Sequence, residues 1–404
     1  MTVLRPFRGL RPPPDVAPHL IAPPYDTVSE AEARAIAGPN PRSFLHVTRP
    51  EVDLDPGSDA HSEAAYRKAR QNFDSFRERG WLVEEKSPAY YLYAQTWQGR
   101  TQTGLMALCR VDAYDKGEIK RHELTRPDKE LDRVMHIEAL DAQTGLVFLA
   151  YRDRKELKDA VAAAKGGRRI WQTTTSDGVV HALSIIDDPK LIETIAWAFQ
   201  GEPTVYVADG HHRSAAASRV NANRKGAGSS GWFLAGLFPD SQLRVLAYNR
   251  IVKDLRGHDP AAFRQALEQS FDVAPAVSPE PERRGVVTMY LDHAWWSLTP
   301  KRGIVPDHPV RSLDAQVLQD RVLEPLLGIT DPRTDTRIEF AGGIRGAKYL
   351  SDAVDEGRAA VAFHLFPTGM DQLFAVADAN ELMPPKSTWF EPKLRGGVLV
   401  HKIA

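Results

Sequence analysis

The densest group of side chains able to do chemistry lies in one short string, Asp209-Gly-His-His-Arg213. An apolar β-branched run ends at Asp209 and an alanine-rich pattern follows Arg213, so the sequence predicts a strand, a tight turn and a helix. Basic side chains in the first turn of a helix oppose its dipole, at about 0.3–1 kcal/mol per charge. Stability gives no reason to place three of them there, whereas a bound anion would. We therefore expect this turn to bind phosphate.

The alternative for this string is an ordinary helix start. Asp209 would then cap the helix, the two histidines would be partly exposed, and Arg213 would pair with a surface carboxylate. The position of the string directly after an apolar strand pattern favours a functional site.

A second polar concentration runs from Ile119 to Arg133. The pattern predicts a strand end, a loop and a helix. His122 and Glu123 stand at the end of the apolar stretch, where an imidazole or a carboxylate could move a proton. The alternative is a solvated charged helix with local ion pairs, because charge runs usually form exposed faces.

A third string, from Met383 to Gly397, is also rich in groups suited to phosphate. These groups are Lys386, Ser387, Thr388, Lys393 and Arg395. Prolines stiffen the backbone here, and a frayed tail would not require Trp389 and Phe390. We expect residues 383–397 to dock near the site.

The N-terminal segment, residues 1–26, is rich in proline and can be neither a regular helix nor a central strand. Its apolar residues exceed what a disordered tail requires. We expect it to dock on the rest of the chain and to present Tyr25 and Asp26 to the site.

Hydrophobic periodicity predicts a mixture of helices and strands. Helices are expected at 29–37, 60–80, 189–199, 313–327 and 345–356, and strands at 43–48, 89–96, 103–114, 170–175, 180–186, 232–238, 243–249 and 335–340. We expect 232–238 and 243–249 to be neighbouring strands, and 360–366 with 371–377 to form a hairpin.

Length and composition exclude several classes of protein. The 404 residues exceed one typical domain, and 42% apolar with 26% charged residues are ordinary globular values. A net charge of -1 argues against a protein that coats nucleic acid or an anionic membrane.

Cys109 is the only cysteine, so no intrachain disulfide can form, and it lies in an expected core strand. Without a signal-peptide core or an apolar run of about 18 residues, we expect a soluble cytoplasmic protein.

Several motifs in the same order resemble a known family, the prokaryotic proteins called domain of unknown function 1015. The resemblance covers nearly the full length and includes Arg5-Pro-Phe-Arg-Gly9, Pro23-Pro-Tyr-Asp26, His122-Glu-x-Thr125 with Lys129 and Asp132-Arg133, Ala208-Asp-Gly-His-His-Arg213, Met383-Pro-Pro-Lys-Ser-Thr388 and Phe390-x-Pro-Lys393. That family is similar to the ParB/sulfiredoxin superfamily. The resemblance implies an α/β fold with α+β mixed sheets and a ParB/sulfiredoxin-like nucleotide-binding core. We expect this core, with large insertions, in residues 1–255 and a C-terminal α+β domain in 256–404, whose segment 383–397 docks back on the site.

Members of that superfamily present a Gly-x-His-Arg-like turn to nucleotide phosphates. The resemblance implies that Gly210, His212 and Arg213 form a phosphate cradle and that Asp209 orients the turn or a metal. Sulfiredoxin has a reactive cysteine at the position matching His211, so reduction by a thiol is not expected. ParB proteins add a basic DNA-binding domain, which the neutral charge does not support. The free serine kinases keep Asp-Gly-His followed by Arg and are the nearest functional analogue.

The expected reaction is transfer of a phosphoryl group from ATP or ADP, with Mg²⁺, to the hydroxyl of a small metabolite, with free serine or a similar amino acid preferred. The groups expected to hold the nucleotide are Gly210, His212, Arg213, Lys386, Ser387, Thr388 and Lys393. The candidates for moving the proton are Glu123, Asp26, Asp209, His211, His212 and His122.

Three alternatives stay open. The first is a phosphoserine-type phosphatase, in which water is the acceptor. The second is a nucleotide-gated binding protein that regulates a partner or DNA, although nucleic acid is not the expected partner. The third is a metal-dependent hydrolase with His122, Glu123, His211 and His212 as ligands, which is weaker because the sequence has no His-Glu-x-x-His spacing. The oligomeric state is open, and a homodimer is one option.

Overall fold

The computed structural model describes residues 3–164, 167–200 and 204–403. Two compact units divide the chain, unit 1 comprising Met1–Leu243 with Pro392–Ala404, and unit 2 comprising Arg244–Glu391. The fold is of the mixed α/β class, as expected, because both units combine helices with sheets. The domain boundary expected at 255 stays a prediction, while the compact units change over at 243.

Unit 1 is built on a nine-stranded sheet with the order β6-β11-β8-β12-β5-β4-β10-β9, and β1 pairs with β5. These strands are β1 (Leu4–Arg5), β4 (Tyr90–Trp97), β5 (Arg100–Arg110), β6 (Ile119–Lys120), β8 (Val147–Tyr151), β9 (Arg168–Thr174), β10 (Val180–Ile186), β11 (Val205–Asp209) and β12 (Trp232–Pro239). The sheet is mixed, because β11 runs parallel to β6 and β12 runs parallel to β8, whereas the other pairs are antiparallel.

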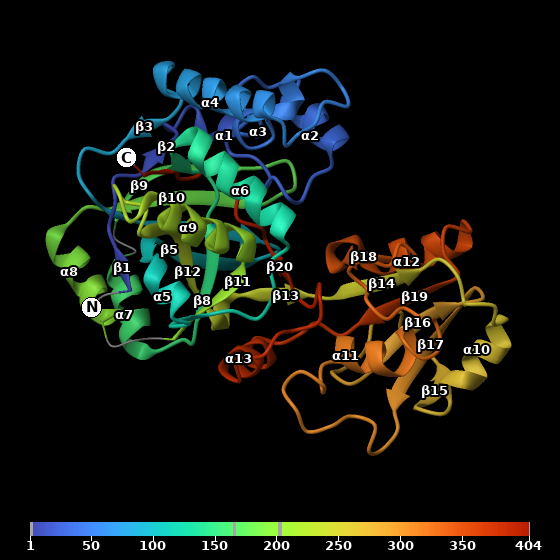
Figure 1. The fold of residues 1–404 in the computed structure, drawn as a ribbon. Helices are drawn as coiled ribbons and strands as arrows, with labels where there is room; N and C mark the ends of the chain where they lie inside the picture. The colour runs from blue at the N-terminus through green and yellow to red at the C-terminus, as the bar shows by residue number, and fades with distance from the viewer. Residues whose placement is uncertain (1–2, 165–166, 201–203, 404) are drawn as a thin grey trace. The chain divides into compact units, whose positions relative to one another are not determined.

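Helices α5 (Val111–Asp115), α7 (Lys155–Ala164), α8 (Pro189–Ala198) and α9 (His211–Arg224) form a core with this sheet (Figure 1). Helices α1 (Ala17–Leu20), α2 (Glu30–Ala37), α3 (Leu45–Thr48) and α4 (Glu63–Glu78) form a separate core with the end of α6 (Pro127–Leu140). Helix α6 packs on α9 through Val134, Ile137, Ala216 and Val220, and α4 packs on the other side of α6. None of the helices in the described parts of the chain has the length and apolar character that a bilayer span requires.

The two ends of the described chain are held in unit 1 by short strand pairs. Strand β2 (Leu10–Arg11) pairs with β3 (Val83–Glu84), and β21 (His401–Lys402) pairs with β7 (Ala142–Gln143). Leu10 also exchanges backbone hydrogen bonds with Val400. The N-terminal segment is therefore docked, as its apolar residues predicted.

Unit 2 contains a six-stranded antiparallel sheet with the order β15-β17-β16-β19-β14-β18. Its strands are β14 (Tyr248–Val252), β15 (Phe271–Pro275), β16 (Val287–Leu291), β17 (Ala294–Pro300), β18 (Ile338–Gly342) and β19 (Val361–Leu365), and β13 (Arg244–Leu246) pairs separately with β20 (Trp389–Glu391). Its helices are α10 (Pro260–Leu267), α11 (Asp314–Leu318), α12 (Gly346–Asp355) and α13 (Met370–Asp378), and a π-helical turn, Gln319–Leu323, follows α11.

The strand expected at 103–114 ends at Arg110, and residues 111–114 belong to helix α5. Three further predictions of secondary structure are wrong. Residues 43–48 contain the helical turn α3 and no strand, because Phe44, Leu45 and Val47 are all buried and a short apolar run fits either form. Residues 371–377 belong to helix α13, whose first turn is closed by a hydrogen bond from the Gly369 N–H to Gln372 Oε1. The third error concerns the strands expected at 232–238 and 243–249.

Those two segments are not neighbouring strands. Strand β12 already has β5 on one side and β8 on the other, so it has no free edge for β13. The chain instead passes into unit 2, where β13 pairs with β20 and β14 pairs with β18 and β19.

The interior of the unit 1 sheet is tightly packed around Gly104 in β5. A Cβ atom at this position would lie 2.3 Å from the Phe238 ring, which packs on Phe148 with ring centroids 4.7 Å apart. Cys109 in the same strand is fully buried, as expected for a core cysteine.

Replacing Gly104 with alanine should therefore destabilise the protein by about 1–3 kcal/mol, because the buried Phe238 ring has no room to move aside. Thermal and urea unfolding of Gly104→Ala would measure this loss. Gly231→Ala is the matched control, since its added Cβ would meet only an ordinary contact, 3.7 Å from Asn221 Oδ1. Equal stability of the two variants would contradict the packing described for β5.

Candidate functional site

The predicted strand, turn and helix at Asp209-Gly-His-His-Arg213 are present. Strand β11 ends at Asp209, Gly210 has a φ of 95°, and α9 begins at His211. This left-handed conformation is strained for residues other than glycine, so Gly210 lets the chain pass directly from strand to helix. It also makes room for Arg213, whose Nε atom would lie 3.0 Å from an added Cβ.

The start of α9 has no side-chain cap. Gly210 occupies the N-cap position, so Asp209 does not cap the helix as the ordinary alternative required. The Gly210 carbonyl oxygen accepts hydrogen bonds from the Arg213 and Ser214 N–H groups. The positive end of the helix dipole thus lies beside Asp209 without a capping carboxylate.

Two cations converge on the Asp209 carboxylate. Lys393 Nζ lies 3.0 Å from Asp209 Oδ2, and Arg213 Nη2 lies 3.4 Å from Oδ1. Burial acts to raise the pKa of Asp209, but the charges of Lys393 and Arg213 outweigh it and hold the pKa well below its usual range. Asp209 is therefore ionised at neutral pH.

Arg213 links this carboxylate to the N-terminal segment. Its Nη2 lies 3.7 Å from Asp26 Oδ2, and its Nη1 donates a hydrogen bond to the Leu146 carbonyl oxygen. Burial alone would lower the pKa of Arg213, yet Asp26 and Asp209 raise it. The expectation that residues 1–26 present Asp26 to the turn agrees with this geometry.

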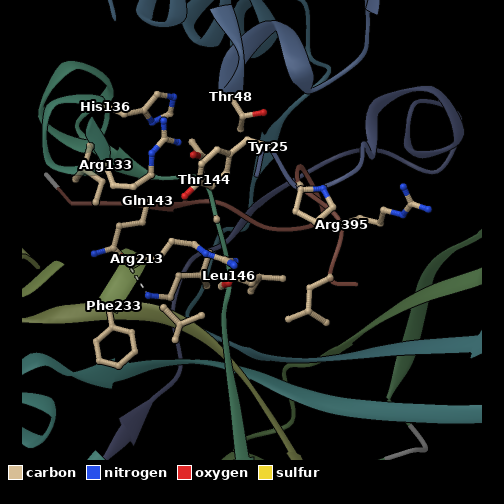
Figure 2. A pocket seen from close by; sticks show the side chains of 17 residues that line it. Tyr25, Thr48, Arg133, His136, Gln143, Thr144, Leu146, Arg213, Phe233 and Arg395 are labelled. Carbon is tan, nitrogen blue, oxygen red and sulfur yellow. Dashed lines mark hydrogen bonds between the residues drawn. The ribbon is translucent and has the colours of Figure 1, made fainter. Parts of the chain in front are cut away.

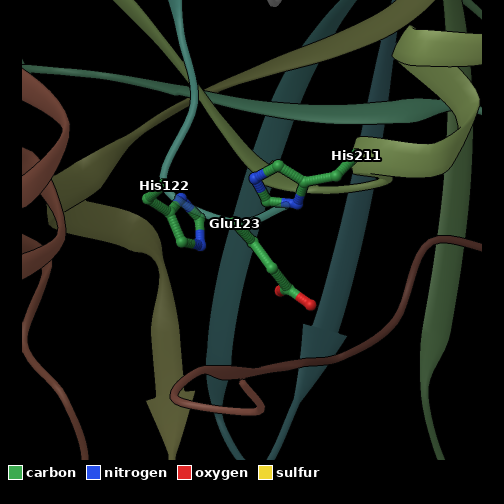
Figure 3. A group of neighbouring side chains, drawn as sticks. All are labelled: His122, Glu123 and His211. Atoms are coloured by element: carbon green, nitrogen blue, oxygen red, sulfur yellow. The ribbon is translucent and has the colours of Figure 1, made fainter. Parts of the chain in front are cut away.

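His122 and Glu123 reach the same turn because β6 and β11 are parallel. Val205 is paired with Ile119 and Tyr206 with Lys120, so the residues after β6 run beside the end of β11. His122 and His211 are in edge-to-face contact, with ring centroids 4.5 Å apart (Figure 3). Candidate ligand atoms of His122, Glu123 and His211 lie within 4.8 Å of one another.

Both of these histidines are buried, and most of their ring nitrogens lack hydrogen-bond partners among the described residues. Within the described parts of the chain, no group meets hydrogen-bond geometry with either ring nitrogen of His122 or with Nε2 of His211. Burial lowers the pKa of His122 to about 4 and lowers the pKa of His211 well below its ordinary value. Both rings are therefore neutral near pH 7.

His212 has a different environment from His211. Its Nε2 accepts a hydrogen bond from the Arg126 N–H at 3.0 Å, which ties the start of α9 to the residue before α6. An imidazole nitrogen that accepts a hydrogen bond is unprotonated, so this contact favours the neutral ring.

A pocket opens beside Arg213 (Figure 2). About 630 Å³ of space, including its solvent-filled mouth, is free of atoms. The polar and charged groups in its lining are Tyr25, Thr48, Arg133, His136, Gln143, Thr144, Arg213 and Arg395. Arg213 therefore contacts both the Asp209 carboxylate and this pocket.

One wall of the pocket is formed by Arg133, which lies in α6. The Arg133 guanidinium lies 3.9 Å from the centre of the Tyr25 ring, and its Nε donates a hydrogen bond to Asp132 Oδ2 at 2.8 Å. Tyr66 and His61 also bind the Asp132 carboxylate, at 2.9 Å and 2.8 Å. Sequence reasoning included Asp132 and Arg133 in a polar string but did not assign them to a pocket.

Other pocket residues carry no signal in the sequence. Gln143 and Thr144 follow α6 after Asp141, which has a left-handed backbone and ends the helix. No motif or periodicity singles them out, so only the fold reveals their position.

Three expected phosphate-binding residues, Lys386, Ser387 and Thr388, belong to unit 2. Ser387 Oγ donates a hydrogen bond to the Pro384 carbonyl oxygen at 2.7 Å, and Lys386 Nζ lies 5.6 Å from the centre of the Tyr248 ring. Their contact with phosphate, like the docking of residues 383–391 on the site, stays a prediction. Lys393, from the same string, belongs to unit 1 and reaches Asp209.

The Asp132 carboxylate should stabilise the pocket wall in a pH-dependent manner. Burial acts to raise its pKa, but the charge of Arg133 and the hydrogen bonds lower it below its ordinary value. Asp132→Asn should therefore cost about 1–3 kcal/mol at pH 7. This stabilisation is present above about pH 4 and is lost as the pH falls through the lowered pKa of Asp132. The difference in free energy of unfolding between Asp132→Asn and wild type should therefore narrow near about pH 3.

Urea unfolding at the two pH values would measure this difference. Asp128→Asn is the matched control on the same helix, because the Asp128 side chain is 58% exposed and contacts Arg126 at the surface. A loss for Asp132→Asn that does not change with pH would show that the charge of Asp132 is not what stabilises Arg133.

Three solved structures show distant similarity in sequence to this chain. A free serine kinase in complex with AMP is 12% identical, with a TM-score of 0.38, over 70% of this chain and 86% of that chain. SbnI with a C-terminal truncation, from Staphylococcus aureus, is 12% identical, with a TM-score of 0.40, over 72% and 85%. A conserved hypothetical protein from Pyrococcus furiosus is 12% identical, with a TM-score of 0.36, over 70% and 90%. No curated protein matches in sequence.

A family comparison gives a clear result. The model of the family described as "Protein of unknown function (DUF1015)" matches residues 4–316, which is most of the chain. This match confirms the family that the ordered motifs predicted, while the motifs at 383–393 lie beyond the matched residues. The chain belongs to the DUF1015 family.

Proposed function

We propose that this protein transfers a phosphoryl group from ATP or ADP to the hydroxyl of a small metabolite, with free serine or a similar amino acid as the preferred acceptor. The observation that carries the proposal is the meeting of Arg213 and Lys393 on Asp209 beside the start of α9, with Arg213 also lining a pocket. Phosphoryl transfer needs charge neutralisation and alignment more than covalent chemistry, and this arrangement offers both.

The phosphate groups would bind at the turn. The backbone at Gly210 and the first residues of α9 provides the positive end of a helix dipole, and Arg213 provides a planar donor. Lys393, now paired with Asp209, could move to a phosphate oxygen and return after transfer. In this arrangement His212 holds the residue before α6 against the cradle.

Mg²⁺ would accompany the nucleotide, and the site has oxygen ligands suited to it. The Asp209 carboxylate is ionised, and Asp26 lies on the other side of Arg213. Carboxylates together with phosphate oxygens are the ligands that Mg²⁺ prefers. When bound, the ion would neutralise charge on the transferred group.

The acceptor would bind in the pocket. Arg133 pairs with Asp132 and Arg395 pairs with Asp177, and the remaining N–H groups of either guanidinium can bind the carboxylate of an amino acid. Thr144 can bind its other polar groups. Asp209 is a weak base because two cations stabilise its ionised form. Asp26 or Glu123, whichever does not hold a metal ion, can instead accept the hydroxyl proton, and the neutral rings of His122 and His211 are further candidates while they are metal-free.

The phosphate cradle can be tested through nucleotide affinity. Arg213→Ala should weaken ADP binding by roughly 10- to 100-fold, because it removes a charge-assisted donor. Isothermal titration calorimetry would measure the change. Arg219→Ala on the same helix is the matched control, since its side chain is 48% exposed and contacts Glu130. An unchanged affinity for ADP in Arg213→Ala would show that Arg213 does not belong to a phosphate cradle.

The reaction itself is tested by following phosphorylated products. Incubation with ATP or ADP, Mg²⁺ and a panel of amino acids should yield one phosphorylated amino acid by phosphorus NMR. Release of inorganic phosphate from phosphoserine without a nucleotide would favour a phosphatase. Tight nucleotide binding without product from any acceptor would favour a regulatory nucleotide-binding protein.

A further inference from the structure

The loop after β6 and the start of α9 bring two histidines and a carboxylate together outside the phosphate cradle. His122 and Glu123 follow β6, and His211 is the first residue of α9 (Figure 3). Their candidate ligand atoms lie within 4.8 Å of one another, and the three residues come from two positions nearly ninety residues apart in the sequence. We propose that His122, Glu123 and His211 bind a divalent transition-metal ion such as Zn²⁺.

The buried ring nitrogens are the first argument. His122 is 2% exposed and His211 is 5% exposed. Among the described residues, no group meets hydrogen-bond geometry with either nitrogen of His122 or with Nε2 of His211, although the Val207 backbone is near enough to favour the charged form of His122. Buried polar atoms in proteins are nearly always paired. A metal ion would bind one nitrogen of each ring. Most of the free-energy cost of burying these nitrogens without a partner would then be removed.

The contact between the two rings is the second argument. The rings meet edge to face with their centroids 4.5 Å apart and an interplanar angle of 90°. Two apolar side chains would fill this space without leaving polar atoms unpaired. A pair of imidazoles in this position instead places nitrogen lone pairs close enough to share one ion.

The ligand types indicate which ion. Two imidazoles and one carboxylate form the set found in catalytic zinc sites, where a further position stays open for water or substrate. Imidazole suits Zn²⁺ and related first-row ions, whereas Mg²⁺ prefers oxygen ligands. This site is therefore distinct in chemistry from the Mg²⁺ that would accompany a nucleotide.

The site lies next to the proposed phosphate cradle. His211 is separated from Asp209 only by Gly210, and the Asp209 charge acts on both His122 and His211. The open position of a bound ion could therefore accept a phosphate or substrate oxygen. Metal binding itself does not depend on the proposed function, and it can be measured without a nucleotide.

The test uses the full chain after treatment with a chelator and dialysis. Titration with Zn²⁺ against a competing chelator should show one ion per chain. His122→Gln and His211→Ala should each weaken the affinity by roughly tenfold or more, and Glu123→Gln should also weaken it. His293→Ala should have no effect, because His293 is a 73% exposed surface histidine that also contacts a carboxylate, Asp355.

Co²⁺ provides a second readout. Its visible absorption spectrum should change on binding to wild type and His293→Ala, and should be lost or altered in His122→Gln. Circular dichroism of the metal-free variants shows whether they fold. If His211→Ala does not fold, His122→Gln serves as the test. Binding of less than one Zn²⁺ per chain would overturn the proposal, and so would equal Zn²⁺ affinity in wild type and both folded histidine variants. A protein that binds Zn²⁺ but transfers no phosphoryl group would refute only the proposed function.

Discussion

The ionised carboxylate of Asp209 is the interaction on which the site depends. Partly buried charges are stable only when opposite charges and hydrogen bonds compensate for lost solvation, and here Lys393 and Arg213 provide them. Lys393 comes from the C-terminal segment of unit 1, and Arg213 also contacts Asp26 in the N-terminal segment. One carboxylate thus gathers three distant parts of the chain. The same cations are available to an anion, so the contacts that stabilise this region are also those that would bind a ligand.

Backbone geometry decides which side chains reach this carboxylate. Gly210 allows β11 to become α9 without an intervening loop, because its φ of 95° is open to glycine. The parallel pairing of β6 with β11 then directs His122 and Glu123 along the end of β11. The two features place groups of different chemistry side by side, the cations for which we propose phosphate and the imidazole–carboxylate cluster for which we propose a transition metal.

Sequence reasoning predicted the strand, turn and helix around Asp209 because apolar periodicity and a glycine mark them directly. It could not predict the pairing of β6 with β11, since β6 has only two residues and its partner lies far along the chain. It failed at α3, where a short run of buried residues fits either helix or strand, and at α13, where the helical spacing of Leu373, Phe374, Val376 and Ala377 was missed. The pocket residues Gln143 and Thr144 were missed because they follow a helix end and belong to no pattern.

The assignment of the turn as a phosphate site is tested most directly by a structure of the protein with bound ADP. We expect the phosphate oxygens to accept hydrogen bonds from Arg213 and from backbone N–H groups at the start of α9, with Lys393 shifted from Asp209 towards the phosphate. ADP bound elsewhere, with Lys393 and Arg213 still paired to Asp209, would contradict the assignment.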